Sequence, residues 1–154
     1  MALAFFRHAL VLVRGGGDLA SGVIYRLHRA GFPVVVTELP APLLVRRAVC
    51  FGEAVFSGAI TVEGVTARLA ADVAEARHLL EDGLVPVLVD PAAACRSALA
   101  ACVVVDGRMA KVNLGTSLND APLVIALGPD FTAGLDCHKI AQGTPGLSSV
   151  GNAL

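Results

Sequence analysis

The stretch "VLVRGGGDLASGV", residues 11–23, constrains the fold more than any other part of the chain. An apolar run stops at three consecutive glycines, and an amphipathic helical pattern begins directly after them. Glycines at this point permit a tight turn and let the backbone approach a neighbour closely. The pattern therefore predicts a strand, a turn and a helix that spans 18–30 and ends at Gly31.

Short apolar runs and helical patterns alternate along the rest of the chain. The predicted strands cover 9–13, 33–39, 85–90, 102–106 and 122–127, and the predicted helices cover 18–30, about 42–54, 72–82 and an Ala-rich segment between 91 and 101. Two alternating runs around Glu63 and Gly64 predict a β-hairpin over 59–70. Buried strands that alternate with helices are typical of right-handed βαβ units. We therefore expect an α/β fold, a Rossmann-like three-layer domain with a mostly parallel sheet and a short inserted β-hairpin.

Composition narrows the classes of function. Hydrophobic residues make up 55% of the 154 residues, yet no run reaches the roughly 18 uncharged apolar residues that a membrane span needs. The start of the chain does not have the pattern of a signal peptide. The formal net charge is −1 and the 12 basic residues are scattered, which argues against nucleic acid as a partner. The four cysteines form no CxxC pair, so no disulfide framework or metal site is expected, and we predict a cytoplasmic protein without a membrane partner.

The glycine stretch also fits a pattern for binding the phosphates of a nucleotide. Gly15, Gly17 and Ala20 match G-x-G-x-x-G/A, with Gly16 between the first two, and Glu38 ends the next strand about 20 residues later. The backbone N–H groups at the start of a helix favour an anion, and an acidic side chain after the second strand can accept hydrogen bonds from ribose. An NAD-like ligand is favoured over NADP because Glu38 would repel a 2′-phosphate.

The alternative is a purely structural turn beside an ordinary surface glutamate. Asp18 bears on this choice, because a carboxylate at the start of the helix either competes with a bound phosphate or serves as a helix cap. No Gly-Lys-Ser/Thr sequence follows the glycines, so a P-loop NTPase is excluded.

Further candidate ligand contacts follow later strands. Asp90 and Asp106 each come directly after an apolar run, and Gly128 opens the turn after the run at 122–127. Ligands of open α/β sheets bind outside the carboxyl ends of the strands, so we expect these residues at the ligand-facing edge. The alternative for both aspartates is a helix cap or a turn.

The tripeptide Asp136-Cys137-His138 places a thiol beside an imidazole and a carboxylate. A cysteine nucleophile needs a lowered pKa and a base within reach. Sequence neighbours on an extended segment point to opposite sides, which favours structural roles. No catalytic residue is therefore assigned.

Several motifs together resemble one known family. They are "VRGGGDLASGVIYRLHRAGFPVVVTEL", "RRAVCFGEAVFSG", "TVEGVTA", "VPVLVDP", "AKVNLGTSLNDAP" and "GPDFTAGLDCH". They are similar to the YqeB-like accessory proteins of the selenium-dependent molybdenum hydroxylase system, which are distantly similar to the Rossmann-type half of XdhC/CoxI proteins. The resemblance covers about residues 9–138. It implies a role in maturation or insertion of the molybdenum cofactor, a bound nucleotide or molybdopterin-nucleotide, and a molybdenum hydroxylase or its cofactor-maturation proteins as partners.

The resemblance ends after His138, which sets the predicted domain at 1–138. The segment 139–154 is rich in Gly and Ser without periodicity, and it predicts an irregular tail of the kind left by a truncation or a frame shift. Three functions thus remain open: a nucleotide-binding accessory protein, an NAD-dependent oxidoreductase or nucleotide-using transferase, and an inactive fragment of either. Exposed strand edges of a fragment would favour a homo-oligomer.

Overall fold

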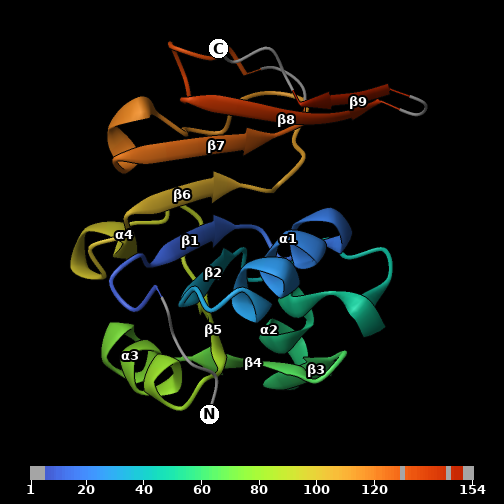
Figure 1. Ribbon diagram of the computed structural model, residues 1–154. Helices are drawn as coiled ribbons and strands as arrows, with labels where there is room; N and C mark the ends of the chain where they lie inside the picture. Colours follow the sequence, from blue (N-terminus) through green and yellow to red (C-terminus); the bar gives the residue numbers. More distant parts are fainter. Residues whose placement is uncertain (1–5, 129–130, 145–146, 151–154) are drawn as a thin grey trace.

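The computed structural model of the chain describes residues 6–128, 131–144 and 147–150. Its strands are β1 (Val11–Arg14), β2 (Val34–Glu38), β3 (Ala59–Val62), β4 (Val65–Ala70), β5 (Val85–Val89), β6 (Val103–Asp106), β7 (Leu123–Leu127), β8 (Lys139–Thr144) and β9 (Leu147–Val150). Within the described residues they form one nine-stranded sheet in the order β3-β4-β5-β2-β1-β6-β7-β8-β9 (Figure 1). Neighbouring strands pair in parallel except at the two edges, where β3 and β9 run antiparallel.

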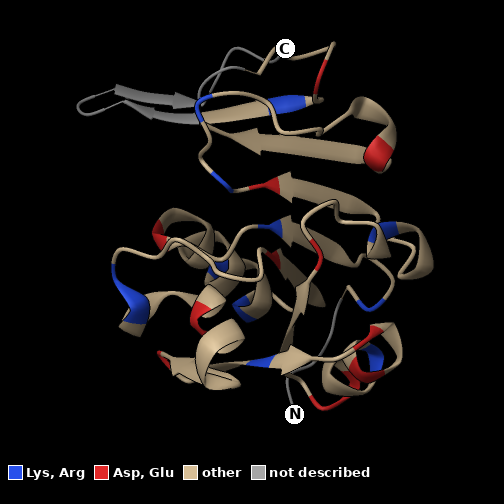
Figure 2. Cartoon of the chain, turned by 180° about the vertical axis from the view of Figure 1, so that it is seen from behind, with Lys and Arg blue, Asp and Glu red and all other residues tan. Residues whose placement is uncertain are grey.

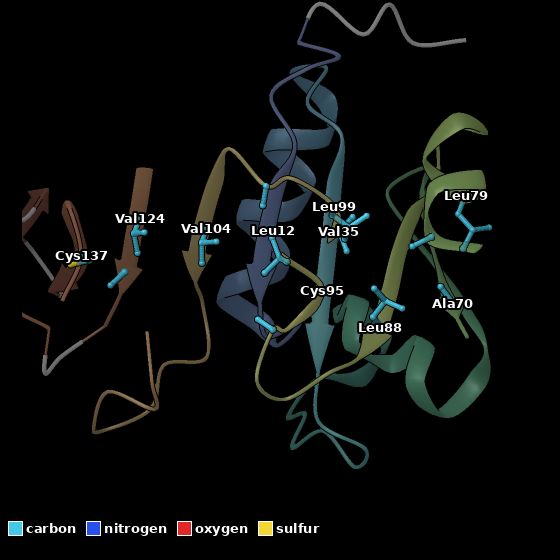
Figure 3. Close-up of a cluster of buried hydrophobic side chains, with 14 residues drawn as sticks. Leu12, Val35, Ala70, Leu79, Leu88, Cys95, Leu99, Val104, Val124 and Cys137 are labelled. Carbon is cyan, nitrogen blue, oxygen red and sulfur yellow. The ribbon is translucent and has the colours of Figure 1, made fainter. Parts of the chain in front are cut away.

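Helices cover both faces of this sheet. They are α1 (Asp18–Arg29), α2 (Ala54–Ser57), α3 (Val73–Glu81) and α4 (Cys95–Ala98), and the 3-10 turns are η1 (Arg47–Val49), η2 (Phe51–Glu53) and η3 (Leu118–Asp120). One buried cluster joins the sheet to α1 and α2 through Ile24 and Ala54. A second cluster joins the other face to α3 and α4 through Leu79 and Cys95 (Figure 3). The expected three-layer, mostly parallel Rossmann-like fold is confirmed.

The two covered faces explain why the strands are apolar without alternation. Successive side chains of a strand point to opposite faces. Leu12 and Val35 therefore enter the cluster with α3 and α4, whereas Val11 and Val34 enter the cluster with α1 and α2. All four residues are at most 2% exposed. Continuous Val/Leu runs of this kind are what a parallel sheet buried on both faces requires.

The predicted hairpin at 59–70 is confirmed as β3 and β4. Glu63 and Gly64 form its two-residue turn with φ of 51° and 81°, as a type I′ turn requires. β4 also pairs in parallel with β5, so the hairpin extends the main sheet.

Two predictions of local structure are wrong. The segment 42–54 does not form one continuous helix but contains the short 3-10 turns η1 and η2, because Gly52 packs on the glycine turn and its N–H donates to the Gly16 carbonyl at 2.9 Å. The segment 139–154 does not form an irregular tail, because Lys139–Thr144 pairs with β7 and Leu147–Val150 pairs with β8. Residues 145–146 and 151–154 of that segment lie outside the described residues.

No helix among the described residues has the length and apolar character needed to cross a bilayer.

The start of α3 provides a test of local helix capping. Asp72 accepts a hydrogen bond from the Glu75 N–H at 2.8 Å, as an N-cap residue should. We expect Asp72→Ala to lower the free energy of unfolding by about 1 kcal/mol, measured by urea denaturation. Asp82→Ala, at the other end of the same helix, is the matched control and should lower it by much less, because a carboxylate there opposes the helix dipole. Equal losses in the two variants would contradict the assignment.

Candidate functional site

A cleft of about 450 Å³ lies at the carboxyl edge of the parallel strands. Arg14 and Glu38 end β1 and β2 in its floor, and Asp90 and Gly107 line it directly after β5 and β6. β1 lies between β2 and β6, so the chain leaves β1 toward one half of the sheet and returns to build the other half from β6. Open α/β sheets bind their ligands at such a switch point. Charged residues end β1, β2 and β6 in the centre of the sheet (Figure 2).

The three glycines have different surroundings. Gly15 has a φ of +93°, which L side chains rarely adopt, and it lines the cleft beside Arg108. Gly16 lies under the turn, where an added Cβ would meet the Gly52 nitrogen at 2.6 Å. Gly17 is the N-cap residue of α1 and lines the cleft, and an added Cβ would meet nothing within 4 Å. Of the three, Gly15 and Gly17 are therefore the ones that a ligand in the cleft can approach.

Glu38 holds the glycine turn closed. Its Oε1 accepts the Gly16 N–H at 2.6 Å, its Oε2 accepts the Leu39 N–H at 2.8 Å, and the residue is 8% exposed. The N–H of Gly16 was predicted to face a phosphate, and it instead has a carboxylate from the same chain as its acceptor. Ribose contact by Glu38, which also lines the cleft, stays a prediction.

Asp18 anchors the segment that follows β2. Its Oδ1 accepts a hydrogen bond from the Cys50 thiol at 2.8 Å, and its Oδ2 accepts the Arg46 Nε–H at 2.6 Å. The bond from Cys50, followed by that from Arg46, lowers the pKa of Asp18. Burial, followed by Asp18, raises the pKa of Cys50 to about 12, so the thiol stays protonated. Asp18 is the first residue of α1 and Gly17 is its N-cap, so Asp18 does not take the helix-cap alternative.

Asp106 was predicted to contact a ligand, and the structure instead directs it into the protein. Its carboxylate accepts hydrogen bonds from the Arg108 guanidinium, the closest at 2.6 Å, and from the Thr116 hydroxyl at 2.6 Å. Burial alone would raise the pKa of Asp106, but the bonds from Arg108 and Thr116 outweigh it and lower the pKa. The carboxylate therefore fastens the loop 107–116 over the sheet, and Asp106 does not line the cleft.

Asp90 and Gly128 take different positions at this edge. Asp90 lines the cleft and begins the turn before α4: its carbonyl accepts the Ala93 N–H at 2.9 Å and its Oδ2 accepts the Cys95 N–H at 2.9 Å, while the N-cap of α4 is Ala94. Gly128 follows β7 with a φ of +100° and lies against Met109, whose Sδ would be 3.2 Å from an added Cβ. Gly128 does not line the cleft itself, but Met109 does.

Sequence reasoning missed Arg14. This arginine ends the buried strand β1 and is 3% exposed. It donates to the Thr116 hydroxyl at 3.1 Å and to the Pro91 carbonyl at 2.9 Å. The signal was available in the sequence, since a charged residue directly after a buried apolar run lies at the ligand-facing edge.

The Asp136-Cys137-His138 tripeptide has structural contacts. His138 Nδ1 accepts the Val124 N–H at 2.8 Å, and Asp136 accepts the Thr132 N–H at 2.9 Å. Cys137 is buried, and burial followed by the charge of Asp136 raises its pKa. None of the three lines the cleft. Across the described parts of the chain, no group of three or more His, Cys, Asp and Glu side chains has the spacing to hold a metal ion.

These features define a Rossmann-like α/β domain with a cleft at the switch point of its sheet, bordered by a glycine turn. Over 135 residues, 88% of the chain, it is 53% identical to the "Uncharacterized protein YqeB" of Escherichia coli strain K12. The chain is thus similar to one part of that relative. The chain spans 25% of the length of that relative. No family model and no solved structure matches the chain.

Gly16 and Gly17 offer a matched pair for testing the turn. Gly16→Ala should lower the free energy of unfolding by about 1–3 kcal/mol, because the new Cβ would overlap the Gly52 backbone. Gly17→Ala has open space and an ordinary φ of −75°, so it should cost only the smaller loss of a glycine N-cap. Urea denaturation of both variants measures the difference. A more stable Gly16→Ala would show that Gly52 does not pack on this turn.

Asp106 predicts a pH dependence of stability. Its pKa in the folded protein is lower than the reference value of 3.8, so its carboxylate stabilises the fold above that pH and loses this effect as the pH falls through the folded value. Asp106→Asn should lower the free energy of unfolding by about 3 kcal/mol at pH 7, because it leaves the partly buried Arg108 unpaired. The difference from the wild type should shrink below pH 3.8. Denaturant titrations at pH 7 and pH 3 test this, and a constant difference would refute it.

Proposed function

We propose that the chain binds a nucleotide or a nucleotide-bearing cofactor in the cleft at the carboxyl edge of the sheet. The observation that carries this proposal is the position of the cleft at the switch point between β1 and β6, beside the glycine turn and the first turn of α1. The first N–H groups of a helix have no partner within the helix, and the helix dipole favours negative charge there. A phosphorylated ligand fits this position on general grounds.

The walls of the cleft support a ligand with a flat apolar part. Leu39, Leu43 and Val45 line the cleft after β2 and are 45%, 93% and 92% exposed. Leu19 in the first turn of α1 adds a further exposed apolar side chain. A nucleobase or a pterin would cover these side chains and remove apolar surface from water. Glu38 and Asp90 lie on the same side and offer acceptors to ribose hydroxyls.

Binding is favoured over catalysis by the chemistry of the lining. Among the described residues that line the cleft there is no His, Cys, Lys or Tyr. The ionisable side chains there are two arginines, Arg14 and Arg108, and three carboxylates, of which Glu38 and Asp90 already accept backbone N–H groups. Asp18 likewise accepts from Cys50 and Arg46, so all three carboxylates are engaged within the chain, whereas a general acid or base must exchange a proton with the substrate.

We further propose a place for the protein in the cell. The motif resemblance over residues 9–138 supports an accessory protein of the selenium-dependent molybdenum hydroxylase system, acting in the cytoplasm in maturation or insertion of the molybdenum cofactor. The ligand is then an NAD-like or molybdopterin-nucleotide, and the partners are the hydroxylase or its cofactor-maturation proteins. This assignment is tested by copurification. The hydroxylase should copurify with the tagged chain, and it should no longer do so when the genes for the cofactor-maturation proteins are deleted.

Thermal melts against NAD, NADP, ATP, GTP, CTP, S-adenosylmethionine and a molybdopterin nucleotide test the binding proposal. A ligand at about 100 times its dissociation constant adds about 2.7 kcal/mol, which raises the midpoint by roughly 5–10 °C for a domain of this size. Gly17→Val should abolish the shift, because Gly17 lines the cleft and its Cβ would stand in open space, where the larger side chain takes room from the ligand.

Gly22→Ala is the matched control, since Gly22 is exposed in the middle of α1 and does not line the cleft. It should retain the full ligand-induced shift. A cooperative melt that none of the ligands moves would refute the proposed function.

A further inference from the structure

Arg14 is a buried cation whose described contacts are all to neutral groups. The residue is 3% exposed, and its two terminal nitrogens donate to the Thr116 hydroxyl and the Pro91 carbonyl. Its Nε is buried and has no hydrogen-bond acceptor among the described residues. Across the described part of the chain, no carboxylate lies within ion-pair distance of its guanidinium.

The nearby carboxylates are engaged by other arginines. Asp106 is bound by Arg108, at 2.6 Å for the closest pair of atoms, and Asp120 lies 3.5 Å from the Arg96 guanidinium. Burial lowers the pKa of Arg14, and repulsion from Arg108 lowers it further, while Asp106 and Asp120 act in the opposite direction. The cationic form of Arg14 is therefore destabilised in the protein relative to water.

A buried charge is costly unless it is paired and hydrogen-bonded. Arg14 lines the floor of the cleft, where a ligand can supply the negative group that the chain itself does not. An oxyanion placed there would accept hydrogen bonds from the guanidinium, and such charge-assisted bonds are among the strongest that proteins form.

The side of the cleft formed by Glu38, Asp90 and the glycine turn does not offer an equivalent position for an oxyanion. The Gly16 N–H already donates to Glu38, and the carboxylates of Asp18, Glu38 and Asp90 all line the cleft. Glu38 ends β2, Asp90 follows β5 and Asp18 begins α1, whereas Arg14 ends β1 and Arg108 follows β6. The cleft is thus polarised across the switch point.

We propose that Arg14 is the cationic partner of the ligand's oxyanion, and that the glycine turn at Gly16 is not. The inference rests on the proposed function and narrows its ligand class. The ligand is a nucleoside derivative whose phosphate or carboxylate is seated at the β1/β6 side, with its hydroxyl groups toward Glu38 and Asp90. A dinucleotide held by its pyrophosphate at Gly16 does not fit this arrangement.

The test uses the full ¹⁵N-labelled chain and follows two NMR signals, the Arg14 Nε–H and the Gly16 amide. The probes are AMP, GMP and CMP for phosphate, S-adenosylmethionine for carboxylate, the matched nucleosides, and NAD. At least one anionic probe should shift the Arg14 Nε–H far more than its nucleoside does, while the Gly16 amide stays in place. A shift of the Gly16 amide without one at Arg14 would overturn this inference and leave the proposed function standing. No shift anywhere with any probe would overturn this inference, and the proposed function would fall with it if the melt against the full ligand panel were also unmoved.

Affinity measurements on Arg14→Gln give a second readout. The variant should bind the anionic probe about 10- to 100-fold more weakly and leave the affinity for the matched nucleoside unchanged. Arg26→Gln removes the same charge from an exposed position on α1 that is not in the cleft, and it should change neither affinity. An equal loss for nucleotide and nucleoside would show that Arg14 acts only through the fold. If Arg14→Gln does not fold, the wild-type NMR signals decide the question.

Discussion

The hydrogen bond between the Gly16 N–H and the Glu38 carboxylate is the contact on which the site depends. It joins the turn after β1 to the end of β2, and the Gly16 carbonyl accepts from both the Gly52 N–H and the Ser21 hydroxyl. Ser21 in turn accepts the Phe51 N–H. The backbone of a single residue, Gly16, thus connects the turn, helix α1 and the segment that leaves β2. The segment before α2 is held by these contacts and not by helix propensity.

A second network holds the opposite wall. Asp106 binds Arg108 and Thr116, and Thr116 also accepts from Arg14, so the loop 107–116 is fastened to the ends of β1 and β6. The two networks face each other across the switch point, one built on carboxylates that accept backbone N–H groups and the other on guanidiniums. The sheet brings them together, because the parallel strands β1, β2 and β6 end at the same edge. The charge pattern of the cleft is therefore a consequence of topology.

Sequence reasoning reached most of the fold because local signals were strong. The apolar runs located the central strands within a few residues, and the glycine turn, the hairpin turn and the Asp72 cap followed from backbone rules. It failed where the deciding partner is distant in sequence. β8 and β9 lack periodicity, and β8 exists because the edge of β7 offers unpaired backbone groups. Five of the candidate residues line the cleft, namely Gly15, Gly17, Asp18, Glu38 and Asp90. Gly16, Asp106 and Gly128 do not line it.

The sequence by itself determined the buried strands, the conformation of the glycine turn and the edge at which polar residues gather, because side-chain periodicity and glycine φ preferences act over a few residues. Only the tertiary structure decided which partner each polar group takes. Glu38 reaches Gly16 across 22 positions, Ser21 reaches Phe51 across 30, and Arg14 reaches Thr116 across 102. Buried polar groups must find partners wherever the fold places them. Packing thus decided that the Gly16 N–H is bound by Glu38, and that Arg14 has no counter-ion within the described chain.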